Sequence, residues 1–156
     1  MILVTTPTGN IGHHVVDILL RAGKQLRLFV RDAEKLSQNV RNITNVVEGN
    51  LHDVEAFTQA ATGASAVFFC VPQSSDTEDV RAYYESFSNS ATAAFKAAGV
   101  TRIVTISGGR GNTSDSGPNG PLAPRSMLTT IVNGSLRTFT LPCTIVYAIL
   151  TVVYET

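Results

Sequence analysis

The N-terminal part of the chain constrains its fold more than any other feature. An apolar run, Ile2–Thr5, leads into a turn that contains Gly9 and Gly12. A helical segment and a second apolar run, Leu26–Val30, follow. A strand, a glycine-bearing turn, a helix and a second strand are the parts of a dinucleotide-binding βαβ unit. Because backbone N–H groups and the helix dipole both favour a phosphate at the start of such a helix, the turn predicts a pyrophosphate site.

The turn departs from the usual dinucleotide fingerprint at one position. The pattern G-x-x-G-x-x-G is met at Gly9 and Gly12, but Thr6 occupies the first glycine position. That glycine lets the chain turn sharply off the strand, and a β-branched residue is stiff where a positive φ is needed. Pro7 partly offsets the loss by fixing its own φ. The alternative is an ordinary strand-to-helix loop in which Asn10 caps the helix.

Composition indicates a globular domain and excludes several classes of function. The 156 residues suffice for one domain, 1–156, with its own core. The 12 Lys and Arg residues balance 12 Asp and Glu residues, so no nucleic-acid-binding surface is predicted. No apolar run approaches the ~18 residues of a membrane span, and no secretion signal precedes the first strand. We therefore expect a cytoplasmic protein without membrane or nucleic-acid partners.

Metal-binding and redox residues are few. Cys70 and Cys143 lie far apart in strand-like runs, where cysteines are usually small buried hydrophobic residues. His13 and His14 open the first expected helix without a metal-spaced partner. We expect no metal site.

Short apolar runs alternate with helix-length segments along the rest of the chain. This alternation predicts an α/β fold, a doubly wound parallel sheet of the Rossmann type with helices on both faces. The expected strands are 2–5, 26–30, 45–48, 66–71, 102–107 and 143–147. The expected helices are 11–22, 54–61, 78–98 and a weaker one at 125–139, and a long loop is expected at 108–124.

Ligands of such a sheet bind beyond the carboxyl ends of its strands. The residues at these ends therefore form the candidate cofactor site. They are Thr6, Thr8, Gly9, Asn10, Ile11, Gly12, Arg31, Asn50, Val71, Pro72 and Ser107.

Arg31 bears on the choice of cofactor. It follows the second expected strand, where an acidic residue selects NAD and an arginine accommodates the 2′-phosphate of NADP. Lys35 lies one helical turn beyond and adds positive charge. The alternative is a surface arginine paired with Asp32 or Glu34. We expect NADP (NADPH) to be preferred over NAD.

The other candidate residues have structural alternatives. Asn50 can hydrogen-bond an adenine edge, but a turn also explains it. Val71 and Pro72 would form an apolar wall beside the cofactor, although Pro72 also ends a strand. The Ser107 hydroxyl would face a substrate or the nicotinamide, or else cap the following turn.

Several segments together resemble the NmrA-like family of atypical short-chain dehydrogenases/reductases, which binds NADP or NAD. Residues 2–12 correspond to the family's VTGATGNIG, residues 96–104 look like its AAGVKRIV, and residues 141–146 are similar to its LPYTILRP. Residues 28–36, 47–53 and 64–68 add to the match. The resemblance covers nearly the whole chain in register.

The chain also departs from this family. The Tyr-x-x-x-Lys pair of typical short-chain dehydrogenases is absent, because no Tyr follows Ser107 before Tyr147 and no Lys follows Lys96. Without that pair the usual general-acid route has no carrier, and no catalytic residue is assigned. Family members usually continue into a smaller C-terminal substrate-binding part, which we expect to be absent here.

The resemblance implies an NADP(H)-dependent oxidoreductase acting on a small organic substrate, such as a quinone, an imine or a secondary-metabolite intermediate. One alternative is a non-catalytic NAD(P) sensor that binds a protein partner, and another is an inactive truncated fragment. The apolar run at 149–153 suggests self-association, as in a homo-oligomer, or poor solubility.

Overall fold

The computed structural model describes residues 1–72, 78–108, 125–132 and 135–142. These residues form one sheet in the order β3-β2-β1-β4-β5-β6-β7. Its strands are β1 (Ile2–Thr5), β2 (Leu26–Val30), β3 (Asn45–Glu48), β4 (Ala66–Phe69), β5 (Arg102–Gly108), β6 (Arg125–Val132) and β7 (Ser135–Pro142). Strands β1 to β5 are parallel, and β6 and β7 add to β5 as an antiparallel hairpin. The parallel part has the Rossmann order 3-2-1-4-5.

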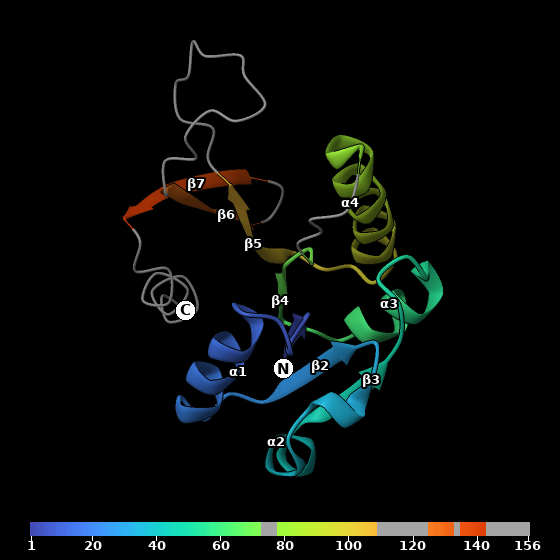
Figure 1. Cartoon of the computed structure of the whole chain (residues 1–156), viewed down its shortest axis with the longest axis vertical. Helices are drawn as coiled ribbons and strands as arrows, with labels where there is room; N and C mark the ends of the chain where they lie inside the picture. Colours follow the sequence, from blue (N-terminus) through green and yellow to red (C-terminus); the bar gives the residue numbers. More distant parts are fainter. Residues whose placement is uncertain (73–77, 109–124, 133–134, 143–156) are drawn as a thin grey trace.

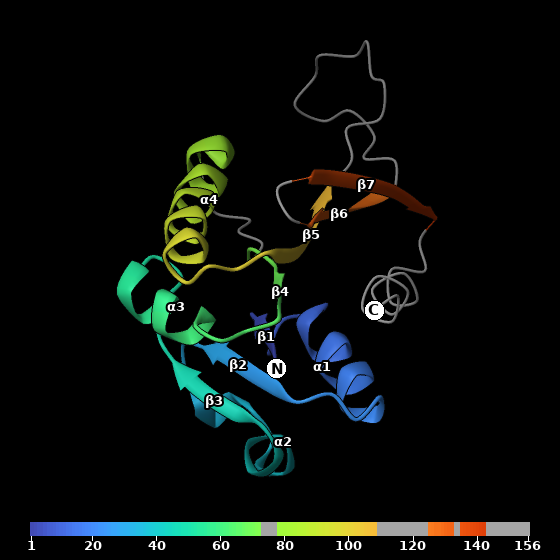
Figure 2. The same ribbon diagram turned by 180° about the vertical axis from the view of Figure 1, so that it is seen from behind.

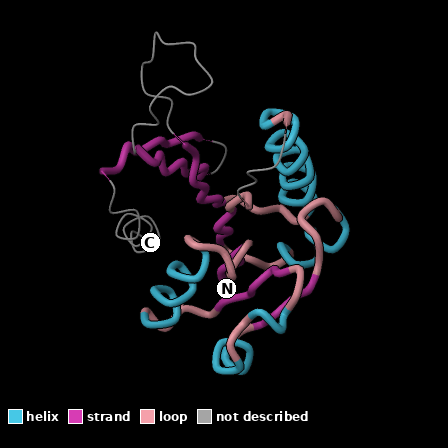
Figure 3. Tube along the Cα trace, in the orientation of Figure 1, coloured by secondary structure: helices cyan, strands magenta, loops and turns pink. Residues whose placement is uncertain are grey.

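Helices cover both faces of the parallel part. They are α1 (Gly12–Arg21), α2 (Gln38–Ile43), α3 (Val54–Ala61) and α4 (Val80–Ala97), with a short 3₁₀ turn η1 (Ala33–Lys35). Helix α1 lies on one side of the sheet, and α3 and α4 lie on the other (Figures 1 and 2). Figure 3 shows strands and helices alternating from β1 to β5. The predicted doubly wound α/β fold is therefore confirmed.

Two buried clusters explain this layering. In β1, Val4 points to one face and packs with Val15 and Leu19 of α1. Leu3 points to the other face, where Phe57 of α3 and Phe95 of α4 are buried. All of β1 is buried, which suits a central strand covered on both faces. The alternation of side chains along one strand thus holds helices against both sides.

Aspartates begin two helices and a glycine follows each of them. The Asp53 side chain accepts a hydrogen bond from the backbone of Ala56 at 3.0 Å and begins α3. Asp79 does the same for Ala82 at 2.9 Å and begins α4. Gly63 and Gly99 follow the two helices with φ of 75° and 67°. Left-handed glycines of this kind end helices at little steric cost.

Two boundaries differ by two residues from the predicted ones, and one predicted element is wrong. Strand β4 ends at Phe69 and not at residue 71, and α4 begins at Val80 and not at residue 78. The predicted helix at 125–139 is wrong, because β6 and β7 occupy it. Its runs of β-branched and aromatic residues, Thr129–Val132 and Thr138–Thr140, favour strands. Strand β6 pairs along the whole of β5, and β7 pairs with β6. The predicted strand 143–147 and most of the loop 108–124 lie outside the described residues.

Candidate dinucleotide site

The loop after β1 contains an unusual backbone conformation. Thr6 has a φ of 50°, the left-handed region that L residues rarely adopt. Among the described residues it is the one non-glycine position with a positive φ. This is the position at which the dinucleotide fingerprint has its first glycine. The predicted need for a positive φ there is confirmed, and Thr6 meets it with backbone strain.

Two hydroxyl groups attach this loop to the end of β4. The Thr6 hydroxyl donates to the Cys70 carbonyl at 3.3 Å. The fully buried Thr5 hydroxyl lies 3.3 Å from the carbonyl oxygens of Phe68 and Cys70 and accepts from the Cys70 N–H at 3.0 Å. Sequence reasoning missed Thr5, although a threonine that closes an apolar strand was a usable signal. The hydroxyls keep the loop in a fixed position beside β4.

Gly12 allows α1 to begin directly against this loop. A Cβ at Gly12 would overlap the Thr6 carbonyl oxygen and lie 3.1 Å from the Cα of Pro7. A Cβ at Gly9 would meet the same oxygen at 3.3 Å, a contact that small shifts relieve. The Gly9 N–H donates to that oxygen at 3.0 Å. The helix start is therefore packed so closely against the loop that residue 12 must lack a side chain.

The start of α1 has the features of an anion site. Ile11 is the N-cap residue, and no side chain caps the helix. The alternative role of Asn10 as a cap is therefore not observed, and its side chain is exposed. The first N–H groups of a helix have no partner within the helix. In α1 the His13 N–H donates to the Gly9 carbonyl at 3.1 Å, so the N–H groups of Gly12 and His14 are the ones available to a phosphate. Thr8, also exposed, lies in the same loop. The helix start, which no side chain caps, fits the pyrophosphate of a dinucleotide.

The end of β2 carries an unpaired arginine. Asp32 accepts from the backbone N–H of Glu34 at 3.0 Å, and its other oxygen lies 4.0 Å from the Lys35 ammonium. Within the described part of the chain, the exposed Arg31 makes no ion pair. The alternative in which Arg31 pairs with Asp32 or Glu34 is therefore not observed. The guanidinium remains available to an anionic group at the end of β2.

The turn after β3 follows the structural alternative. The Asn50 side-chain oxygen accepts from the His52 N–H at 3.1 Å, as in an Asx turn. Asn50 is exposed, and its amide N–H groups are not part of that turn. Gly49 is required before it, because a Cβ there would lie 2.6 Å from the Phe29 ring. The turn is thus explained without a ligand and still presents an amide at the carboxyl edge.

The ends of β4 and β5 complete the edge. Val71 and Pro72 are half-buried, and Val71 packs against the cluster of α3 and α4. The Pro72 carbonyl accepts from the Tyr83 hydroxyl at 3.1 Å, a contact that sequence reasoning missed. Ser107 lies within β5, one residue before its end, and pairs with Met127 of β6. Parallel pairing brings the loops after β1, β2 and β4 to the same edge of the sheet.

The Cys70 thiol lies partly buried at this edge. Burial raises the pKa of its thiol, and the hydroxyl of Thr6 beside it opposes this rise only in part. A thiol with a raised pKa is a poor nucleophile at neutral pH.

No cluster of metal-binding side chains occurs among the described residues, and no helix there is long and apolar enough to cross a membrane.

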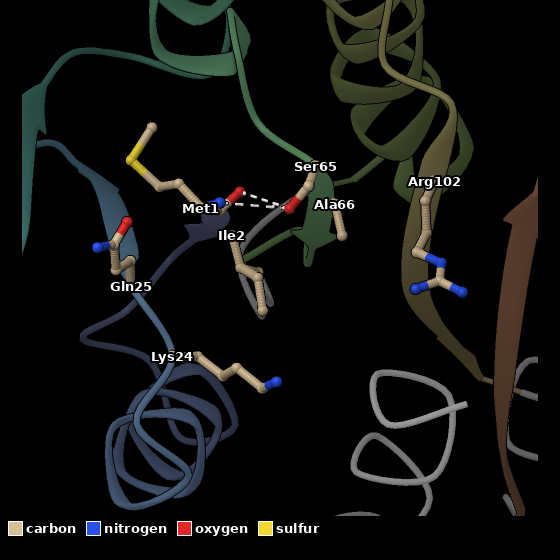
Figure 4. A pocket seen from close by; sticks show the side chains of 7 residues that line it. All are labelled: Met1, Ile2, Lys24, Gln25, Ser65, Ala66 and Arg102. Carbon is tan, nitrogen blue, oxygen red and sulfur yellow. Dashed lines mark hydrogen bonds between the residues drawn. The ribbon is translucent and has the colours of Figure 1, made fainter. Parts of the chain in front are cut away.

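A shallow pocket of about 200 Å³ lies at the opposite edge of the sheet (Figure 4). It is lined by Met1, Ile2, Lys24, Gln25, Ser65, Ala66 and Arg102, at the amino ends of β1, β4 and β5. The Ser65 hydroxyl donates to the Met1 carbonyl at 3.0 Å. Ligands of this fold bind beyond the carboxyl ends, so this pocket is separate from the candidate site.

A family model described as NAD(P)H-binding matches residues 7–137. Curated proteins gave no sequence match. Among solved structures, an NADPH-dependent quinone oxidoreductase from Escherichia coli, complexed with NADPH, is 26% identical with a TM-score of 0.55. Triphenylmethane reductase from Citrobacter, complexed with NADP(H), is 25% identical with a TM-score of 0.56. A Rossmann-fold NAD(P)-binding family protein from Shigella flexneri is 24% identical with a TM-score of 0.54 and supports the fold alone.

These likenesses cover only part of the neighbours. The matches to the E. coli, Citrobacter and Shigella proteins cover 66%, 65% and 65% of this chain, but 35%, 35% and 48% of the respective neighbour. The family match agrees with the dinucleotide-binding domain that the sequence motifs predicted. The family match spans most of the chain, and the fold and the loop after β1 agree with it. The chain therefore belongs to the NAD(P)H-binding family and has its Rossmann-type dinucleotide domain.

Proposed function

We propose that this chain is the cofactor-binding part of a cytoplasmic, NmrA-like oxidoreductase that prefers NADP(H) to NAD(H). The observation that carries the cofactor preference is Arg31, which is exposed at the end of β2 without an ion-pair partner in the described structure. The 2′-phosphate of NADP(H) would lie at this strand end. Two of the structural neighbours are described as complexes with NADPH or NADP(H), which supports the same preference.

Each candidate residue has a role in this proposal. The start of α1 would hold the pyrophosphate, with Thr6, Thr8 and Gly9 to Gly12 forming the turn around it. The amide of Asn50 would hydrogen-bond the adenine, and Val71 and Pro72 would form an apolar wall beside the cofactor. The bound nicotinamide would supply hydride transfer. In this proposal the chain's own residues bind and orient the cofactor, and Ser107 would face the nicotinamide or the substrate.

The substrate in this proposal is a small organic acceptor. A quinone is favoured because one structural neighbour is described as a quinone oxidoreductase. A triarylmethane dye is a second class to test, because another neighbour is described as a triphenylmethane reductase. An imine is a third. The chain covers about a third of each of these two neighbours, so its activity on any acceptor remains part of the proposal.

A non-catalytic sensor of NAD(P) is the second candidate function. The observation in its favour is the missing Tyr-x-x-x-Lys pair, since no Tyr occurs between Ser107 and Tyr147 and no Lys follows Lys96. A sensor needs the cofactor site but not a general acid. An inactive fragment would instead bind the cofactor weakly and have no activity.

Two measurements separate these functions. Isothermal titration with NADPH and NADH tests the cofactor site, and we expect tighter binding of NADPH. Oxidation of NADPH, followed by its absorbance with quinones, triarylmethane dyes and imines, tests catalysis. Binding with acceptor-dependent oxidation supports the oxidoreductase, and binding without oxidation supports the sensor. No binding of either dinucleotide would contradict both.

A further inference from the structure

We propose that Glu48 is a specificity-determining residue that limits the preference for NADP(H). Its carboxylate places a fixed negative charge beside the proposed 2′-phosphate site at Arg31. This inference rests on the proposed function, because it concerns the choice between two cofactors of the same site.

Strand pairing places Glu48 next to Arg31. Glu48 is the last residue of β3 and lies opposite Val30, the last residue of β2. The N–H of Gly49 then donates to the Val30 carbonyl at 2.9 Å, so the two strand ends are joined. Figure 2 shows β2 and β3 side by side in the same direction. The residue after Val30 is Arg31, so Arg31 and Glu48 lie at the same corner of the sheet.

A hydrogen bond holds the Glu48 carboxylate against the turn after β2. Its Oε1 accepts from the backbone N–H of Ala33 at 2.6 Å. Such charge-assisted bonds are short and comparatively strong. Ala33 is two residues beyond Arg31, so the negative charge is fixed at the turn that carries the arginine.

Of the carboxylates of Asp32 and Glu48 at this corner, only that of Asp32 has a cationic side chain beside it in the described structure. The carboxylate of Asp32 has the Lys35 ammonium 4.0 Å away. Glu48 has no cationic partner among the residues that the structure describes. A dianionic 2′-phosphate at Arg31 would be repelled by this carboxylate, whereas the neutral 2′-hydroxyl of NAD(H) would not. The Glu48 carboxylate therefore counteracts the attraction of Arg31 for the 2′-phosphate. It reduces the difference in affinity between NADP(H) and NAD(H).

The test replaces Glu48 with glutamine. Glu48→Gln keeps an oxygen acceptor for the Ala33 N–H and removes the charge. We expect the ratio of the NADH Kd to the NADPH Kd to rise about twofold to fivefold, the scale of screened interactions between exposed charges. The variant should bind NADPH more tightly, and its affinity for NADH should stay nearly constant. Its affinity for adenosine 2′,5′-bisphosphate should also rise, whereas its affinity for adenosine 5′-monophosphate should not change.

Glu34→Gln is the matched control. It removes an equal charge from the same turn, and the Glu34 side chain makes no hydrogen bond or ion pair among the described residues. We expect a smaller change in the Kd ratio from this variant. Glu48→Ala provides a second removal of the Glu48 charge, and the unfolding midpoint of each variant without ligand reports whether it folds.

The outcomes distinguish this inference from the proposed function. An unchanged Kd ratio in Glu48→Gln and Glu48→Ala, with both dinucleotides still bound, would overturn the role of Glu48 alone. An equal rise in Glu34→Gln would show a general charge effect and would also overturn it. A wild-type chain that binds neither dinucleotide would overturn the proposed function and this inference together.

Discussion

At the residue scale, Thr6 combines backbone strain with a compensating hydrogen bond. Its φ of 50° is unfavourable for a β-branched residue, by about 1–2 kcal/mol. Its hydroxyl donates to the Cys70 carbonyl at 3.3 Å, an interaction of about 0.5–1.5 kcal/mol. The two effects are of similar size, which explains how a threonine is tolerated where the fingerprint has glycine.

Substitutions at Thr6 separate these two effects. Thr6→Gly relieves the strain and loses the hydrogen bond, so we expect the free energy of unfolding to stay within about 1 kcal/mol of wild type. Thr6→Val keeps the strain of a β-branched residue and loses the hydrogen bond to Cys70. We expect this variant to lower the free energy of unfolding by about 1 kcal/mol. Urea unfolding measures both. We also expect Thr6→Gly to bind NADPH more tightly, and equal or weaker binding would show that Thr6 suits the turn.

The two glycines of the loop after β1 should respond differently to a methyl group. Gly12→Ala places a Cβ on the Thr6 carbonyl oxygen, so we expect a loss of about 1–3 kcal/mol in unfolding free energy and weaker NADPH binding. Gly9→Ala is the control, because its Cβ would meet that oxygen at 3.3 Å. Chemical denaturation of the two variants checks this, and equal stability losses would contradict the packing described for Gly12.

At the element scale, an aromatic cluster joins α3 and α4 to the sheet. The Phe57 ring of α3 is fully buried and lies 5.2 Å from Phe29 of β2 and 5.0 Å from Phe95 of α4, between ring centroids. The ring centroid of Phe69, in β4, lies 6.2 Å from that of Phe57. This packing supports one side of the carboxyl edge, where Val71 and Pro72 lie.

Removing the central ring should weaken the whole domain. We expect Phe57→Ala to lower the free energy of unfolding by about 3–5 kcal/mol, from lost burial and a cavity. Ile43→Ala provides the control, because Ile43 is 66% exposed and its truncation should change stability by less than about 0.5 kcal/mol. Thermal and urea unfolding measure both variants. A loss below about 1 kcal/mol for Phe57→Ala would contradict the role of the cluster.

The elements predicted best from sequence are those with clear ends. Helix α3 has the predicted bounds because Asp53 caps it and Gly63 follows it. The short helix α2 was missed, since only two of its six residues, Val40 and Ile43, are apolar. The signal for its start was the cap at Ser37. The helix expected at 125–139 was wrong because pairing with β5 decides that segment, and such a partner is remote in sequence.

The candidate site was predictable only in part. The glycine turn and Arg31 follow from local pattern, and their positions in the fold agree with it. The Asp32–Lys35 pair and the Glu48–Ala33 hydrogen bond depend on side-chain geometry and strand register, which sequence spacing does not specify. The individual ligand contacts of Thr8, Asn50, Val71, Pro72 and Ser107 stay predictions.

At the scale of the whole molecule, the parallel direction of β1 to β5 gives the sheet one carboxyl edge, where ligands of this fold bind. The loop after β1 and the turn after β2 both lie at this edge, because the two strands are parallel neighbours. The pocket at Met1 and Arg102 lies at the amino edge. The central claim is that the carboxyl edge binds NADP(H) through the start of α1 and through Arg31.

The most direct test is to titrate the wild-type chain and Arg31→Asp with NADPH and NADH while following the unfolding midpoint. We expect NADPH to raise the wild-type midpoint more than NADH does, because ligand binding to the folded state stabilises it. Arg31→Asp should weaken NADPH binding by about 1–3 kcal/mol, so that NADPH and NADH raise the unfolding midpoint by the same amount. Equal NADPH shifts in both proteins, or no shift with either cofactor, would contradict the account.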